Sequence, residues 1–199
     1  LMKLALRSLA AMLALAATAS FAAAAPSTWN IDASHTEVGF DVRHFFSKVH
    51  GKFNSYDGTI VFDDKDPSKI VVDCSAETKS VDTGNERRDN HLRTSDFFAA
   101  DSFPSITFKS KKVTSTGKGK YAISGDFTLR GVTKTVVFNA EFLGATDAMG
   151  GKAGFAATTV INRRDYGILW NKTLDNGNFM LGDMVTITLN VEANAPAKK

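Results

Sequence analysis

Apolar residues recur at every second position over most of this chain, and that period constrains its fold more than any other feature. Between Thr36 and His44, for example, Val38, Phe40 and Val42 alternate with glycine and charged residues. Successive side chains of a β-strand point to opposite faces, so a period of two predicts a strand with one buried face. The same alternation returns at 58–62, 70–76, 106–108, 121–129, 136–142, 155–161 and 185–191. We therefore predict an all-β protein of about eight strands.

Turn residues separate these segments at 64–68, 116–119, 130–134 and 147–151. Such short connections favour antiparallel pairing. The stretch from Asn85 to Phe98 lacks the alternation. Its residues Glu86–Arg93 favour a helix, and Thr83 or Asn85 is a suitable N-cap. We predict one short helix inserted between strands.

Antiparallel strands with one apolar face close into a barrel or stack as a sandwich, and periodicity alone does not choose between the two. The aromatic content favours a barrel. The chain has 15 phenylalanines, and large rings on the inner face are compatible with an elongated cavity that holds one ligand. A barrel whose rings simply fill the interior is an open alternative. The rings expected on the inner face are Phe40, Phe62, Phe108, Phe127, Phe138 and Phe155.

The first residues have the pattern of a secretory signal peptide. Lys3 and Arg7 precede an uncharged run that ends in the small residues Ala22–Ala25. We expect cleavage after Ala24, so that residues 1–24 are removed and residues 25–199 form a single domain. The chain carries 24 Lys and Arg against 21 Asp and Glu, and two of the basic residues lie in this leader. The remainder is nearly neutral, so we expect no nucleic-acid partner.

The residues that could carry catalysis or hold a metal are sparse. His35, His44, His50 and His91 lack the close spacing of metal ligands, so we expect no metal and no cofactor. Cys74 lies within an apolar alternation, and no Gly-x-Ser-x-Gly motif is present, so nucleophilic catalysis is poorly supported. His44 continues the inward alternation, where a neutral imidazole makes a buried hydrogen bond or meets the polar end of a ligand.

The segment 86–93 is the densest polar cluster, and two interpretations of it stay open. In the first it is a solvated helix held by local ion pairs, such as Asp89 with Arg93. In the second an arginine covers the mouth of the barrel, where its donors bind a phosphate or a phenolic oxygen. Arg88 and His91 are the candidates for such a contact.

Ordered motifs run along nearly the whole chain after the leader. They are Asp32-x-x-His35, Val38-x-Phe40-x-Val42-x-His44, Gly51-x-Phe53-x-x-Tyr56-x-Gly58-x-Ile60-x-Phe62, Arg88-Asp89-x-His91-Leu92-Arg93, Asp96-Phe97-Phe98, Phe103-Pro104-x-Ile106-x-Phe108 and Gly125-Asp126-Phe127-Thr128-Leu129-x-Gly131. Together they resemble the YceI-like family of periplasmic lipid-binding proteins. The resemblance implies a lipocalin-like antiparallel barrel extended by a helix, a periplasmic location, and a long apolar ligand such as a polyisoprenoid.

From the residues and the resemblance we expect a periplasmic protein that binds and carries a polyisoprenoid or quinone-like lipid without covalent chemistry. The candidates for ligand contact are Val38, Phe40, Val42, His44, Ile60, Phe62, Phe108, Phe127, Phe138 and Phe155, with Arg88 and His91 near the head group. Two alternatives stay open: an enzyme acting on an isoprenoid-type lipid, and a stress-related interaction module with a filled barrel. Pairing into a homodimer and a transient contact with a membrane are also left open.

Overall fold

The computed structural model of the protein describes residues 27–63, 69–173 and 179–196. The predicted leader, its cleavage after Ala24 and the predicted turn at 64–68 lie outside these ranges. The strands are β1 (Ser27–Ile31), β2 (Glu37–His44), β3 (Ser47–Phe53), β4 (Tyr56–Phe62), β5 (Val71–Glu77), β6 (Val81–Asp82), β7 (Ser105–Gly117), β8 (Lys120–Leu129), β9 (Val132–Thr146), β10 (Lys152–Asn162) and β11 (Leu181–Asn194). The helices are α1 (Glu86–Arg93) and the 3-10 turns η2 (Thr78–Ser80), η3 (Ala148–Gly150) and η4 (Arg163–Tyr166).

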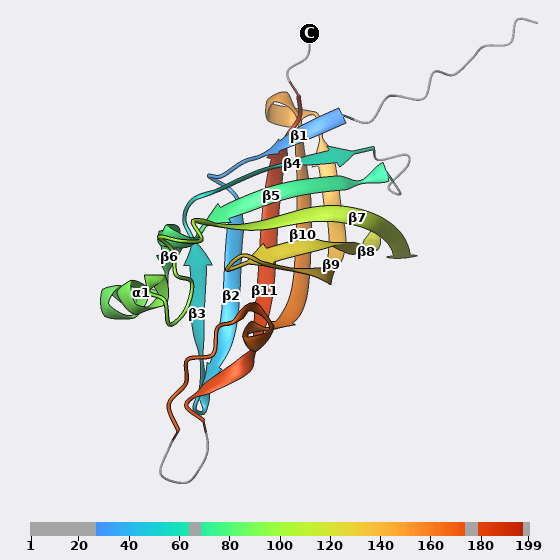
Figure 1. Ribbon diagram of the computed structural model, residues 1–199. Helices are drawn as coiled ribbons and strands as arrows, with labels where there is room; N and C mark the ends of the chain where they lie inside the picture. Colours follow the sequence, from blue (N-terminus) through green and yellow to red (C-terminus); the bar gives the residue numbers. More distant parts are fainter. Residues whose placement is uncertain (1–26, 64–68, 174–178, 197–199) are drawn as a thin grey trace, which may run out of the picture.

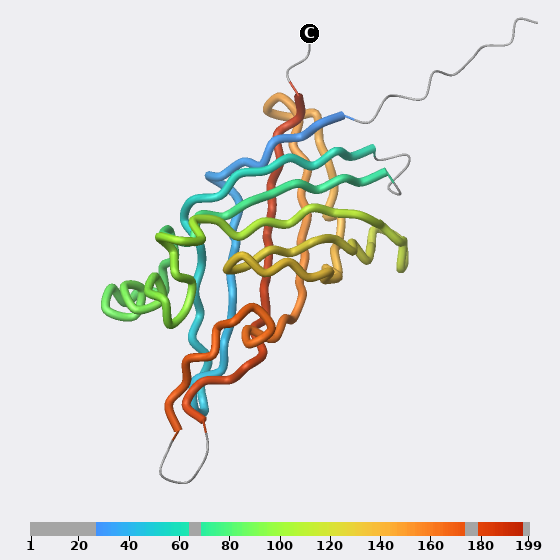
Figure 2. The backbone as a smooth tube through the Cα atoms, in the orientation of Figure 1, coloured from blue at the N-terminus to red at the C-terminus, as the bar shows by residue number. Residues whose placement is uncertain are grey.

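Antiparallel strands close into a barrel, as Figure 1 shows. The order around the ring is β1-β4-β5-β7-β8-β9-β10-β11, and β1 pairs with β11 to close it. The closing contact joins Asn30 to Asn194 and Ile31 to Ala193. The two closing segments lie side by side in the trace of Figure 2, although one begins and the other ends the described chain. The predicted eight-stranded antiparallel barrel with one helical insertion is confirmed.

The sheet continues beyond the ring through β2, β3 and β6. Strand β11 is shared between the two parts. Its residues from Leu181 to Asn190 pair with β2, and its end pairs with β1. In Figure 1 the β2–β3 hairpin therefore reaches below the ring, beside the segment that leads into β11.

The segments predicted from periodicity are not the same set as the strands of the ring. They include β2, which belongs to the extension, and omit β1, β3 and β6. Strand β6 is two residues long and β1 is five, too short to show a clear period. In strand β3 exposed polar residues alternate with the half-buried Val49 and Gly51, and only Phe53 at its end is buried. Its pattern gives little hydrophobic signal.

The alternation of buried residues forms the wall of the barrel. In β8, Tyr121, Ile123, Gly125, Phe127 and Leu129 are buried, and the residues that alternate with them are less so. Helix α1 begins as predicted: the Oδ1 of its N-cap Asn85 accepts a hydrogen bond from a backbone N–H in the first turn at 3.0 Å. None of the helices in the described ranges is long and apolar enough to cross a membrane.

Candidate ligand-binding cavity

An apolar cavity of about 340 Å³ lies between the strands. This volume falls within the range of small-molecule binding pockets, which are mostly apolar with a few polar groups. The inward positions of the alternating strands supply aliphatic and aromatic side chains to its wall, and the segment around α1 covers part of it. The phenylalanine rings thus line the interior without filling it. This finding argues against the alternative of a barrel filled by its own side chains.

The cavity wall contains nearly all of the residues proposed from the sequence for ligand contact. Those that line it are Val38, Phe40, Val42, His44, Ile60, Arg88, His91, Phe108, Phe127, Phe138 and Phe155. Phe62 does not line it. It is 3% exposed, and its ring packs against Phe142 at 4.7 Å and Phe155 at 5.3 Å between ring centroids. Phe62 therefore belongs to the packed core that supports the wall.

Several lining residues lie outside the alternating strands and were not proposed from the sequence. Phe97 and Phe98 follow α1, and Ile168 and Trp170 precede β11. Phe97 and Phe98 were part of a family motif, but no periodic pattern assigned them to a face. Ile168 and Trp170 lie in an irregular segment. They reach the cavity only because the chain before β11 runs back along the β2–β3 hairpin.

His91 is held in an aromatic cluster at the edge of the cavity. Its ring lies 5.0 Å from those of both Phe97 and Trp170, edge to face in each case. Its Nε2 lies 2.8 Å from Oδ2 of Asp96. The imidazole therefore has a fixed orientation, with one edge toward a carboxylate and edge-to-face contacts with two aromatic rings.

The charged side chains of α1 mainly attach the helix to neighbouring segments. Arg88 donates from Nε to Oγ1 of Thr83 at 2.7 Å, and from a terminal nitrogen to the carbonyl oxygen of Thr83 at 2.8 Å. Asp89 is buried and accepts hydrogen bonds from the backbone N–H and the hydroxyl of Thr83. Arg93 donates to the carbonyl oxygens of Lys79 and Val81. The expected ion pair between Asp89 and Arg93 does not form, because both side chains are used to attach the helix to neighbouring backbone.

His44 is less constrained than Arg88 and His91, the other two polar residues proposed for head-group contact. Its ring packs edge to face on Phe45, with centroids 4.6 Å apart. Among the described residues its imidazole has no hydrogen-bond partner, so the buried hydrogen bond expected from the sequence is not formed. An imidazole at the cavity wall with free ring nitrogens can donate to, or accept from, a polar group of a ligand.

Cys74 also lines the cavity, and its thiol is not activated. Burial raises its pKa to about 11, with a smaller contribution from the charge of Asp73. The thiolate is the nucleophilic form of cysteine, and it is scarce at neutral pH when the pKa is this high. The side chain acts as a small apolar part of the wall.

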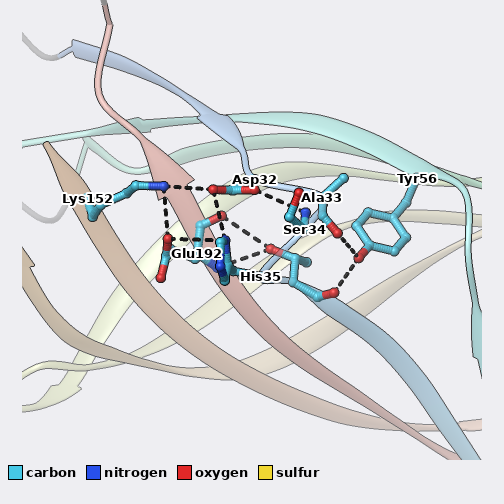
Figure 3. A network of polar contacts seen from close by, with 8 residues as sticks. Asp32, Ala33, Ser34, His35, Tyr56, Lys152 and Glu192 are labelled. Carbon is cyan, nitrogen blue, oxygen red and sulfur yellow. Dashed lines mark hydrogen bonds and ion pairs between the residues drawn. The ribbon is translucent and has the colours of Figure 1, made fainter. Parts of the chain in front are cut away.

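A charged network joins the strands where the barrel closes (Figure 3). Nζ of Lys152 lies 2.7 Å from Asp32 and 3.0 Å from Glu192, and His35 lies 3.2 Å from Asp32. The hydrogen bond from Lys152, followed by that from His35, holds the pKa of Asp32 well below its usual range. Asp32, His35 and Glu192 together have the geometry of metal ligands, but the ammonium of Lys152 already supplies the positive charge between the carboxylates.

The fold and the cavity define a structural class of protein. A closed antiparallel barrel of eight strands around an apolar interior is the architecture of lipocalin-like binding proteins. The model of the YceI-like domain matches residues 29–193, so this chain belongs to the YceI-like family.

Known relatives agree with this assignment. A UPF0312 protein of Vibrio cholerae serotype O1 is 40% identical over 138 residues, which cover 68% of this chain and 73% of the relative. The crystal structure of a YceI protein of Campylobacter jejuni matches with a TM-score of 0.66 and 32% identity, over 84% of this chain and 96% of that one. A polyisoprenoid binding domain from Saccharophagus degradans, implicated in plant cell wall breakdown, has the same fold. It matches with a TM-score of 0.62 and 13% identity, over 86% of this chain and 99% of that one.

Proposed function

We propose that this protein is a periplasmic carrier that binds a polyisoprenoid or related long-chain lipid non-covalently in the barrel. The observation that carries the proposal is the cavity with an almost wholly apolar wall. The description of the Saccharophagus degradans domain as polyisoprenoid binding supports the class of ligand, and the pattern of the first 24 residues supports the periplasmic location.

The hydrophobic effect sets the length of ligand that such a cavity retains. Each buried methylene contributes about 0.8 kcal/mol, so one five-carbon isoprene unit contributes roughly 3 to 4 kcal/mol. Association costs about 4 to 15 kcal/mol in lost freedom of motion. A short terpene therefore binds weakly, and a chain of several units binds firmly. Phenylalanine suits this wall because its ring offers contact area without a polar group that needs a partner.

The polar end of the ligand belongs near the polar residues of the wall. His44 has free ring nitrogens, and Arg88 lines the cavity with part of its guanidinium not used by Thr83. In this proposal one of them meets a head group such as a hydroxyl, a phosphate or a quinone oxygen. His91 contributes packing, since its Nε2 already faces Asp96.

Tryptophan fluorescence tests the proposal directly. Trp170 lines the cavity, whereas Trp29 packs against the core from β1 and is not part of the wall. A Trp29→Phe variant therefore leaves Trp170 as the reporter. We expect a saturable change in its emission when a long-chain polyprenol is added from ethanol, and no change with maltose. A response to maltose without one to the polyprenol would reject a lipid carrier.

A cavity-blocking variant shows whether the response comes from the barrel interior. Ala157 lines the cavity on β10, and Val160 is 54% exposed on the same strand. We expect Ala157→Phe to weaken polyprenol binding by about tenfold or more, because the added ring occupies space that several methylenes would fill. Val160→Phe serves as the matched control and should bind as the parent does. Equal binding by both variants would place the lipid outside the barrel.

A further inference from the structure

The turn of the β2–β3 hairpin carries two phenylalanines where polar residues are the rule. His44 pairs with Ser47, so Phe45 and Phe46 alone form the turn. Phe46 is 100% exposed, and Phe45 adopts a φ of +50°, which is rare for a bulky residue. Two-residue hairpin turns favour Asn, Asp and Gly for this reason. Aromatic residues at such a position are unfavourable for the isolated molecule, which points to a role in contact with something else.

A third exposed ring lies beside this turn. The backbone N–H of Phe45 donates to the carbonyl oxygen of Met180 at 2.9 Å, and Phe179, the residue before Met180, is 63% exposed. In Figure 2 the hairpin turn and the segment leading into β11 lie together at the lower end of the molecule. We call Phe45, Phe46 and Phe179 the aromatic tip.

Three basic residues lie beside the aromatic tip. Arg43 and Lys48 are directly opposite each other on β2 and β3, and Lys172 hydrogen-bonds through its carbonyl oxygen to the backbone of Met180. All three side chains are exposed, and none forms an ion pair with another residue that the structure describes. No acidic residue occurs at 42–49, 169–173 or 179–182. Like charges directly opposite on two strands are unfavourable, and an external anionic surface would relieve this repulsion.

We propose that the aromatic tip inserts into the head-group region of an anionic lipid bilayer, with Arg43, Lys48 and Lys172 contacting the lipid phosphates. Exposed aromatic rings flanked by basic residues are suited to that interface. Two basic tips would repel each other, so the charge favours a membrane over a second copy of this chain.

The position of the cavity suggests what the membrane contact is for, and this step rests on the proposed function of lipid binding. The cavity wall includes His44, Val49 and Met180, all at the base of the aromatic tip. Docking at the tip therefore brings one end of the cavity to the bilayer, where long isoprenoids are dissolved. The free imidazole of His44 lies between the bilayer and the rest of the wall, where a head group would stay while the chain occupies the barrel.

Vesicle flotation tests the docking surface. The purified protein is mixed with vesicles of phosphatidylcholine alone, or of phosphatidylcholine with phosphatidylglycerol. We expect binding to the anionic vesicles, reduced about tenfold by Phe46→Ser and about fivefold by Lys48→Gln. Met149→Ser is the matched control, because Met149 is 88% exposed at the turn between β9 and β10 and should not change binding. Equal binding by Phe46→Ser and the parent would overturn the proposal.

Two further measurements separate the outcomes. Sedimentation of the parent and of Phe46→Ser measures self-association. If the parent forms a dimer that Phe46→Ser loses, and neither binds vesicles, the tip contacts a second copy of the chain and the membrane proposal is rejected. The Trp170 response to polyprenol without vesicles should be unchanged in Phe46→Ser, because Phe46 is not part of the wall. A normal Trp170 response without vesicle binding refutes the docking alone. Vesicle binding without a Trp170 response supports the docking and refutes the carrier.

Discussion

At the scale of single residues, one lysine connects strands at the place where the ring closes. Lys152 begins β10, and its ammonium lies between Asp32, just after β1, and Glu192 on β11. Strands β1 and β11 are the pair that closes the ring. The sequence motif containing Asp32 and His35 was visible, but its partners were not, because Lys152 and Glu192 lie more than a hundred residues further along the chain. Only closure of the barrel brings the charges together.

The Lys152 network makes the stability depend on pH. The pKa of Asp32 is lower in the folded protein than its usual 3.8, so its ionisation stabilises the fold above that pH and this contribution is lost as the pH falls. The pKa of Lys152 is raised above 10.5, so its contribution is lost only in strong alkali. We expect Lys152→Met to lower the Tm at neutral pH, and the difference from the parent to shrink from about pH 5 towards pH 2.

The control for this prediction is Lys120→Met, since Lys120 is exposed on β8 and forms no ion pair with another described residue. Its Tm should follow that of the parent at every pH. A Tm difference for Lys152→Met that stays constant down to pH 2 would show that lost packing, and not charge, causes the effect.

At the scale of elements, sequence pattern was informative where one face of a strand is buried. Helix α1 is predicted because a run of helix-forming residues interrupts the alternation, and of the two N-cap candidates, Thr83 and Asn85, the structure uses Asn85. The pairing irregularities were not predictable. Between Ser110 and Lys112 the register of β7 against β8 shifts, and Gly125 stands opposite Ser110. A bulge depends on the partner strand, so a single strand's sequence does not reveal it.

The bulge in β7 makes Gly125 sensitive to substitution. A Cβ placed there would lie 2.3 Å from the carbonyl oxygen of Lys109 and 2.7 Å from the ring of Phe108. Because the nearest obstacle is backbone, we expect Gly125→Ala to lower the free energy of unfolding by about 1 to 3 kcal/mol, measured by urea denaturation. Gly117→Ala is the control, since its nearest contact would be 3.9 Å away. Equal midpoints for the two variants would argue against this account of the bulge.

At the scale of the whole molecule, the sequence indicated which residues face inward but not whether they leave a cavity. The alternation that assigned Phe108, Phe127 and Phe138 to the inner face is the same for a filled and a hollow barrel. The outcome depends on the circumference of the ring, and that is set by the long-range pairing of β1 with β11. Phe62 illustrates the limit, since it follows the same period as Ile60 yet lies in the core beside the cavity.

The aromatic tip and the cavity are also properties of the whole molecule. Phe45 and Phe179 are far apart in sequence, and they come to the same end of the molecule because the segment before β11 runs along the β2–β3 hairpin. The same arrangement carries Trp170 to the cavity wall. A hairpin that extends the sheet beyond the ring thus serves both the wall of the cavity and the surface proposed to meet the membrane.

The most direct test of the central claim is native mass spectrometry, followed by organic extraction, of the protein purified from its own cells. The account predicts a mass above that of the polypeptide, with a long-chain isoprenoid or quinone-like lipid in the extract. A polypeptide mass alone, unchanged after incubation with a long-chain polyprenol, would contradict it.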